Sequence, residues 1–269
     1  MTSTAAESNW QVPVGIRGFL LDLDGTLYLG NRLLPGADRF IEALRASGRA
    51  CLFLTNNSSR SSEGWAEKLR GLGIPARAEE VFASGEATAA YIAAHRPGAR
   101  VFLLGTPELE AEMVRHGVTC VQEDPDLVLV GFDMGLTYEK LRKACRFVLS
   151  GVDLWATHPD RVCPTPEGPI PDTGSFLALI ESATGKVPDL VIGKPNLPMV
   201  EGALSRLGLR PEEVAMVGDR LYTDMAMARV GGLTGVLVLS GETTLAMLEA
   251  APAAQRPDLV LDGVCSVRF

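Results

Sequence analysis

The sequence has no long apolar run. Although 46% of its 269 residues are hydrophobic, they occur in short segments such as DLVLVGF, and none approaches the roughly 20 apolar residues that a membrane helix needs. The first residues, MTSTAAESNWQVPV, lack the basic start and apolar core of a secretory signal. We therefore expect a cytoplasmic protein that has no membrane partner.

The chain is also short of positive charge. Its 25 basic and 33 acidic residues give a formal net charge of -8, whereas a surface that binds nucleic acid is basic. Nucleic acid is therefore not an expected partner. A local cluster of donors could still bind a small phosphorylated molecule.

Cysteine pairs with metal-ligand spacing are missing. The sequence contains no C-x-x-C motif, and the five cysteines are widely scattered: Cys51, Cys120, Cys145, Cys163 and Cys265. An odd number of isolated cysteines favours reduced, buried thiols over a disulfide framework or a metal centre.

Several catalytic and binding motifs are absent as well. Neither G-x-S-x-G nor G-x-G-x-x-G occurs, and ATGKV lacks the upstream glycine and the following Ser or Thr of a phosphate-binding P-loop. The segment DLDGTLYLGNRL ends in Leu33, where a calcium-binding EF-hand has glutamate. The sequence therefore gives no support for the functions that these motifs carry.

What the chain does have is a regular alternation of elements. Apolar segments at 16–24 and 50–57 read as strands, and segments of helical period follow each of them, at 36–48 and 62–73. The C-terminal third repeats this rhythm at 189–193, 198–208, 213–219, 222–232, 234–241 and 244–251. Strands separated by helices of this length predict an α/β fold with a Rossmann-like, doubly wound parallel sheet.

The middle of the chain has a different pattern of elements and a different composition. It contains a shorter α/β series, and then a loop with five prolines between 159 and 171 that is too stiff for a helix or strand. We therefore expect a core domain formed by 1–96 and 187–269 and an inserted α/β domain at 97–186.

Polar residues follow four of the predicted strands. In open parallel sheets, ligands bind at the carboxyl ends of the strands, so these residues should gather in one crevice: Asp22 and Asp24, Thr55 and Asn56, Lys194, and Asp219 and Asp224. Clustered carboxylates repel one another unless a cation lies between them. Oxygen ligands of this kind suit Mg²⁺. Together with a lysine and amide donors, they predict a site for phosphoryl transfer.

These same residues carry a family resemblance. DLDGT, LTNNS, GKP and GDRLYTD, in this order, resemble the four motifs of the haloacid dehalogenase-like phosphatases. The long insertion between the second and third motifs, with PDTGSFLALIESATG, resembles subclass IIA, which includes p-nitrophenyl, phosphoglycolate, pyridoxal, nucleotide and sugar phosphatases. The resemblance covers nearly the whole chain after about residue 14.

The resemblance implies roles for the catalytic residues. Asp22 would attack the phosphorus atom and form an aspartyl-phosphate, and Asp24 would protonate the leaving oxygen and then activate water. Thr55 and Asn56 would bind the phosphoryl group, which Lys194 would neutralise while orienting the nucleophile.

The resemblance also implies a magnesium site. Its residues would be Asp22, Asp24 through its backbone carbonyl, Asp219 as a direct ligand, and Asp224, for which direct and indirect support of the metal both stay open. The substrate would be a small-molecule phosphate ester. The inserted domain would be a cap over the site and the surface for a possible homodimer.

One residue departs from the family pattern. His158 stands in WATHPD, where members of the subclass commonly have asparagine. This departure makes His158 a candidate for contact with the substrate, and a loop or packing role is an equally open interpretation.

Three other functions compete with this interpretation. A dehalogenase could use the same nucleophile, although the metal-ligand pattern disfavours it, and a phosphomutase or phosphotransferase is disfavoured by the hydrolase-like insertion. A regulatory module that only binds phosphometabolites would have no need for both Asp22 and Asp24. The hydrolytic function is therefore the expected one.

Overall fold

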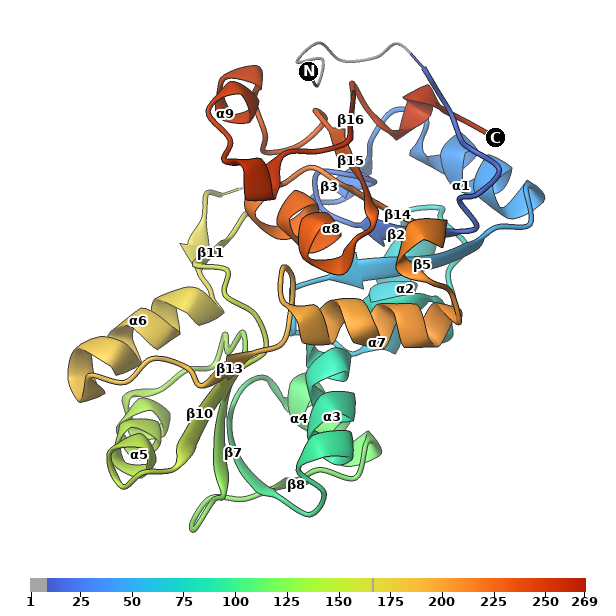
Figure 1. Ribbon diagram of the computed structural model, residues 1–269. Coiled ribbons are helices and arrows are strands. Elements are labelled where there is room, and N and C mark those ends of the chain that lie inside the picture. Colours follow the sequence, from blue (N-terminus) through green and yellow to red (C-terminus); the bar gives the residue numbers. More distant parts are fainter. Residues whose placement is uncertain (1–8, 166) are drawn as a thin grey trace. The chain divides into compact units, whose positions relative to one another are not determined.

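The computed structural model describes residues 9–165 and 167–269, and the chain packs as two compact units (Figure 1). The first unit contains the chain up to Leu54, Ala66–Phe82 and Lys194–Phe269; the second contains Thr55–Trp65 and Ala83–Gly193. Among the described residues, no helix is both long enough and apolar enough to cross a membrane.

The first unit is built on a sheet with strand order β16-β15-β14-β2-β5-β6. The strands are β2 (Gly18–Asp22), β5 (Ala50–Thr55), β6 (Val81–Ala83), β14 (Val214–Gly218), β15 (Thr234–Val238) and β16 (Leu259–Leu261). The strand pairings from β16 through β5 are all parallel. The chain proceeds from β2 toward β5 on one side and later enters β14 on the other, so the doubly wound sheet is confirmed, with its switch point at β2 and β14.

Two central strands explain why the sheet has a buried middle. Every residue of β2 (GFLLD) and β14 (VAMVG) is buried, as expected for parallel strands covered on both faces by helices. The helices of this unit are α1 (Ala37–Ala46), α2 (Ser62–Gly71, from Ala66), α7 (Leu197–Leu207), α8 (Ala226–Gly231) and α9 (Leu245–Glu249). The predicted face of α1 is buried through Phe40, Ile41 and Leu44.

Shorter elements complete the first unit. They are the parallel pair β1 (Trp10–Gln11) and β17 (Val267–Arg268), the antiparallel pair β3 (Tyr28–Leu29) and β4 (Arg32–Leu33), and the turns η1 (Ala78–Glu80), η2 (Pro211–Glu213), η3 (Leu221–Met225), η4 (Ala253–Gln255) and η5 (Val264–Ser266). The hairpin of β3 and β4 lies directly after DLDGT.

The second unit has a parallel sheet of its own, with strand order β13-β10-β9-β7-β8 (Figure 1, green to yellow). Its strands are β7 (Arg100–Leu104), β8 (Thr119–Cys120), β9 (Leu127–Val130), β10 (Asp153–Ala156) and β13 (Leu190–Val191). Its helices are α3 (Ser84–His95), α4 (Pro107–Arg115), α5 (Tyr138–Leu149) and α6 (Thr173–Thr184).

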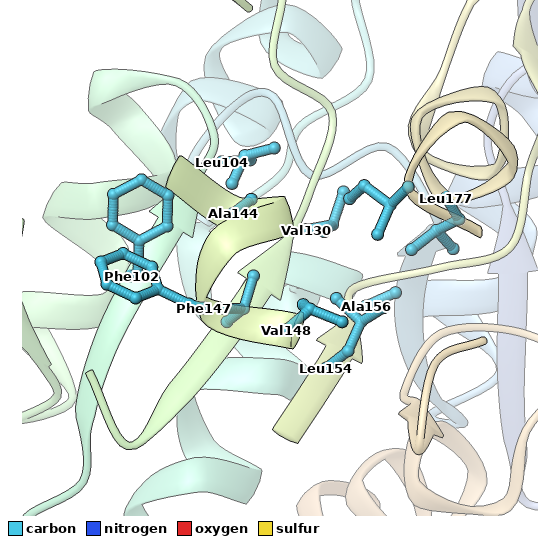
Figure 2. Packing of buried hydrophobic residues seen from close by; sticks show 11 residues of the cluster. Phe102, Leu104, Val130, Ala144, Phe147, Val148, Leu154, Ala156 and Leu177 are labelled. Carbon is cyan, nitrogen blue, oxygen red and sulfur yellow. The ribbon is translucent and has the colours of Figure 1, made fainter. Parts of the chain in front are cut away.

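Side chains of this second sheet alternate between two cores. Phe102 and Leu104 of β7 pack with α5 and α6, and Figure 2 shows this cluster, in which Phe102 meets Phe147 edge to face at 5.1 Å. The intervening Val101 and Leu103 pack with α3 and α4 on the other face. The period of two along the strand thus gives each face its own apolar layer.

The division of the chain differs from the expected boundaries at 97 and 186. Helix α3 contributes Ala89 and Ile92 to the core of the second unit, so the main segment of that unit begins at Ala83, and Thr55–Trp65 belongs to it as well. At the other end, β13 pairs with β10 through Trp155 and Leu190, whereas we expected the segment 189–193 to continue the first sheet. That expectation is wrong because this segment finds its hydrogen-bonding partner in the second unit.

Two smaller expectations also need correction. The proline-rich loop contains a short antiparallel pair, β11 (Val162–Cys163) and β12 (Ile170–Pro171), because proline is tolerated at the end of an edge strand. The cysteines are free thiols as expected, but Cys265 is exposed and the other four are only half-buried.

Candidate active site

Lys194 joins two carboxylates in the first unit. Its Nζ lies 2.5 Å from Oδ1 of Asp22, the last residue of β2, and 2.7 Å from Oδ1 of Asp224. Burial alone would lower the pKa of Lys194, but the charges and hydrogen bonds of the two aspartates outweigh it and raise the pKa above its ordinary value. Lys194 is therefore a permanent positive charge beside Asp22.

Asp224 is placed by a π-helical turn. It lies in η3 (Leu221–Met225), a wider turn that leads directly into α8. Its Oδ2 accepts a hydrogen bond from the backbone N–H of Arg220 at 3.1 Å, and Lys194 occupies its Oδ1. A side chain at Gly218, the last residue of β14, would place Cβ 2.5 Å from Cβ of Asp224. The glycine thus lets Asp224 lie against the end of the strand.

Asp219 follows β14 directly and is 1% exposed. Its Oδ2 accepts a hydrogen bond from the backbone N–H of Glu242 at 2.6 Å. Its Oδ1 is buried and has no hydrogen-bond partner among the described residues. Asp22, Asp219 and Asp224 each offer one carboxylate oxygen within 4.8 Å of the others. The structure therefore brings these three predicted metal residues together.

This carboxylate cluster is electrostatically unfavourable without a cation. Burial, followed by the charges of Asp22 and Asp224, raises the pKa of Asp219 to about 8. Burial also raises the pKa of Asp224 to about 6, against the opposing effect of Lys194. A bound divalent cation would remove both penalties because it favours the ionised carboxylates.

Asp24 has an environment suited to proton transfer. Burial raises its pKa above the ordinary value of 3.8; Lys68 opposes this shift, and Asp22 adds to it. The ammonium group of Lys68 lies over the ring of Tyr28, 4.2 Å from the centroid, and Tyr28 forms a backbone bridge with Asp24. A carboxyl group that retains its proton more readily can act as a general acid.

The turn after Asp24 requires glycine. Gly25 has a φ of +89° and donates its N–H to the carbonyl of Tyr28 at 2.8 Å. A Cβ at this position would lie 2.5 Å from Cγ of Asp219. The DLDGT turn therefore packs its backbone against the carboxylate that follows β14.

Thr55 and Asn56 pack with the second unit. Thr55 ends β5 immediately after Leu54, the residue that pairs with Asp22. The side-chain amide of Asn56 donates a hydrogen bond to Oδ1 of Asp160 at 3.1 Å, and the backbone carbonyl of Asn56 accepts one from the hydroxyl of Ser84. The expected contacts of Thr55 and Asn56 with phosphate stay a prediction.

His158 is fully buried in the second unit. Its Nδ1 lies 2.9 Å from Oγ1 of Thr157, and its Nε2 lies 2.9 Å from Oδ1 of Asp172, which also accepts from the N–H of Thr173 at the start of α6. Direct contact of the ring with substrate stays a prediction. The burial and the two occupied nitrogens favour the packing role that the sequence left open.

Two further residues of the site were not predicted. Arg220 is 16% exposed, with Nε 2.9 Å from Oε2 of Glu242, and the charges of Asp22 and Asp219 act on its guanidinium group. Glu242 belongs to the loop after β15, whose sequence SGETT is polar. The rule that ligands gather at strand ends would have pointed to this loop had it been applied to β15 as well.

The first unit thus combines the groups that phosphoryl transfer requires. Asp22 is an oriented carboxylate, Asp24 can carry a proton, and Lys194 can neutralise an anion. The unpartnered oxygen of Asp219 is the feature that fits a hard cation, because such cations prefer carboxylate oxygen.

Two family models match the chain. A model described as haloacid dehalogenase-like hydrolase matches residues 19–119, and a HAD-hydrolase-like model matches residues 191–267. An acid sugar phosphatase of Staphylococcus aureus is 38% identical over 230 residues, which are 85% of this chain and 88% of that protein.

Solved structures are similar over nearly the whole chain. A 4-nitrophenylphosphatase from Thermotoga maritima has a TM-score of 0.90 and 44% identity, covering 94% of this chain and 96% of the other. A glycerol phosphate phosphatase from Mycobacterium tuberculosis, in complex with magnesium, has a TM-score of 0.88 and 33% identity, covering 94% of this chain and 76% of the other.

Proposed function

The chain belongs to subclass IIA of the haloacid dehalogenase-like hydrolase family and is a phosphatase, and from this premise we propose that it hydrolyses a small-molecule phosphate monoester through an aspartyl-phosphate, with Mg²⁺ as cofactor. The observation that carries the proposal is the buried carboxylate group of Asp22, Asp219 and Asp224 with Lys194 between two of its members.

The residues present fit a divalent cation. Oδ1 of Asp219 is buried without a hydrogen-bond partner among the described residues. Oδ2 of Asp22 accepts a long hydrogen bond of 3.4 Å from the hydroxyl of Thr26, and Asp22 and Asp219 each offer a carboxylate oxygen within 4.8 Å of the other. Both oxygens of Asp224 are occupied, by Lys194 and by the N–H of Arg220. We infer that Asp22, Asp219 and the backbone carbonyl of Asp24 would hold Mg²⁺, and that Asp224 would support them indirectly.

A bound Mg²⁺ would neutralise charge on the phosphoryl oxygens and on the carboxylates. Asp22 would then attack the phosphorus atom through a carboxylate oxygen. The new bond joins this oxygen to phosphorus, and the bond from phosphorus to the ester oxygen breaks. Lys194 keeps the nucleophile oriented and stabilises the transferring group.

Asp24 would supply the proton that the leaving alkoxide needs. Its raised pKa means that Asp24 holds a proton more readily than an ordinary aspartate does, and after donation the carboxylate would take a proton from the water that hydrolyses the aspartyl-phosphate. The two aspartates thus have separate roles, attack for Asp22 and proton transfer for Asp24.

The phosphate and substrate contacts would come from residues of the second unit. Thr55 and Asn56 follow the strand partner of Asp22 in sequence and would bind the phosphoryl oxygens. The second unit would act as the cap that excludes water and selects the leaving group. Relatives named for sugar phosphate, 4-nitrophenyl phosphate and glycerol phosphate support a small phosphate ester as substrate.

A steady-state assay with 4-nitrophenyl phosphate tests this proposal. We expect hydrolysis that requires Mg²⁺, that falls by at least about 10³-fold in Asp22→Asn, and that is unchanged in Asp38→Asn, an exposed aspartate of α1. Rapid quenching of wild type should yield a phosphorylated peptide that contains Asp22. Full activity in Asp22→Asn would refute the mechanism, and binding of phosphate esters without turnover would favour a regulatory module.

A further inference from the structure

The loop after β15, residues 240–243, lies outside all of the catalytic motifs but contacts Asp219 repeatedly. The backbone N–H of Glu242 donates to Oδ2 of Asp219 at 2.6 Å, and the hydroxyl of Thr243 donates to the backbone carbonyl of Asp219 at 2.5 Å. One bond therefore restrains the carboxylate and the other restrains the main chain that carries it. Thr243 is 3% exposed, so water does not compete freely for this bond.

Gly241 in the same loop packs directly against the Asp219 side chain. A Cβ added to Gly241 would lie 2.5 Å from Cγ and 2.7 Å from Cβ of Asp219, closer than nonbonded carbon atoms approach. Gly241 is not among the glycines with positive φ, so the requirement for glycine here is the space and not the backbone conformation.

Gly25 confines the carboxylate of Asp219 as well. A Cβ on Gly25 would lie 2.9 Å from Oδ1 and 2.5 Å from Cγ of that residue. The hydroxyl of Ser240 donates to the carbonyl of Gly25 at 2.8 Å. Three segments of the first unit, which follow β2, β14 and β15, are thus joined around one carboxylate.

The loop is itself anchored by Glu242. Its side chain lies 2.9 Å from Nε of Arg220 and accepts a hydrogen bond from the hydroxyl of Tyr222 at 3.2 Å. Both partners belong to the segment between Asp219 and Asp224. Displacement of the loop would therefore disturb the same segment that carries the metal residues.

We propose that the 240–243 loop is the positioning element for the metal site: it holds Asp219 in one rotamer, with Oδ2 occupied and Oδ1 directed to the cation. The inference rests on the proposed Mg²⁺ dependence. Its physical basis is that the groups surrounding a ligand set metal affinity by fixing the ligand's orientation before the metal binds.

Calorimetric titration of the full chain with Mg²⁺ tests the proposal, with circular dichroism as the measure of folding. We expect Gly241→Ala to weaken Mg²⁺ affinity by about 10- to 100-fold, because the methyl group displaces the Asp219 carboxylate. The matched control is Gly263→Ala in the loop after β16, where φ is −176° and a Cβ would have only Cys265 Sγ within 4 Å, at 3.8 Å. Its affinity should equal that of wild type.

Substitutions of Thr243 give a second test that keeps the loop's shape. Thr243→Val removes the hydroxyl and should weaken Mg²⁺ affinity by about tenfold, and Thr243→Ser, which keeps the hydroxyl, should retain it. If Gly241→Ala does not fold, this pair decides the question. Folded Gly241→Ala and Thr243→Val should show the loss as a weaker calorimetric Kd and as a higher Mg²⁺ requirement in the assay, whereas Gly263→Ala and Thr243→Ser should match wild type in both.

The outcomes separate this inference from the proposed function. Wild type that neither binds nor requires Mg²⁺ would refute the proposed function itself. Wild type that binds Mg²⁺, together with folded Gly241→Ala or Thr243→Val variants of equal affinity, would refute only the positioning role of the loop.

Discussion

At the scale of single residues, Lys194 has an unusual position because it is 2% exposed between two buried carboxylates. Ions lose hydration when they are buried, so the cluster of Lys194 and its two carboxylates contributes little net stability as a whole. Removal of one member is costly, however, since the remaining charges are then buried without compensation. The lysine therefore links the proposed catalytic site to the stability of the first unit.

This position predicts a large effect of Lys194→Met. We expect the free energy of unfolding to fall by about 3–5 kcal/mol and activity to be lost, because Asp22 and Asp224 then repel each other. Adding Asp224→Asn should restore part of the stability without activity. Urea denaturation measures both effects, and exposed Lys186→Met should change stability by less than about 0.5 kcal/mol. A Lys194→Met variant as stable as wild type would contradict the prediction.

At the scale of elements, the two central strands of the first unit are joined where they begin. Glu213, in η2 just before β14, accepts hydrogen bonds from the N–H of Arg210 at 3.0 Å and from the guanidinium of Arg17 at 2.9 Å. Arg17 immediately precedes β2, and its N–H donates to the carbonyl of Glu213 at 2.7 Å. These bonds set the register in which Val214 pairs with Gly18.

The hydrogen bonds to Glu213 predict a dependence of stability on pH. The N–H of Arg210, followed by the side chain of Arg17, lowers the pKa of Glu213 from 4.5 to about 2. A carboxyl group with a lowered pKa in the folded state stabilises that state above the unfolded pKa, and loses this effect as pH falls toward the folded pKa.

We therefore expect Glu213→Gln to be less stable than wild type at neutral pH, by a difference that shrinks as pH falls from about 4.5 to about 2. Urea denaturation across this range measures it. The neighbouring Glu212→Gln is the control, because the side chain of Glu212 is 64% exposed. A difference that is constant over the range would contradict the assignment.

At the scale of the whole molecule, the chain contains two units, each with its own parallel sheet and its own buried core. The carboxylate cluster and Lys194 belong entirely to the first unit. The effect of metal binding on each of the two units can therefore be measured separately.

We expect saturating Mg²⁺ to slow hydrogen exchange in the segments after β2, β14 and β15, because a ligand that binds only the folded state suppresses local opening around its site. Exchange in β7, β9 and α5 of the second unit should be unchanged. Hydrogen exchange with mass spectrometry, with and without Mg²⁺, measures both units in one experiment. If Mg²⁺ slowed exchange throughout the second unit as much as in the first, or did not slow it after β14, the result would contradict this expectation.

The amino-acid sequence by itself determined the four adjacent strands β2, β5, β14 and β15, several helices, and the placement of Asp22 and Asp219 at strand ends. Runs such as GFLLD and VAMVG are apolar throughout, and parallel connections place their carboxyl ends at one edge of the sheet. These conclusions depend on local periodicity and on general rules of topology, which a single sequence contains.

Only the tertiary structure decided which distant groups meet. Lys194 pairs with Asp224 as well as with Asp22, β13 joins the second sheet rather than the first, and the loop after β15 contacts Asp219 from more than 20 residues away. Such contacts arise from packing and hydrogen-bond geometry between elements, and no local pattern encodes them. The sequence therefore identified the residues that we propose to react, and the fold determined the contacts that orient them.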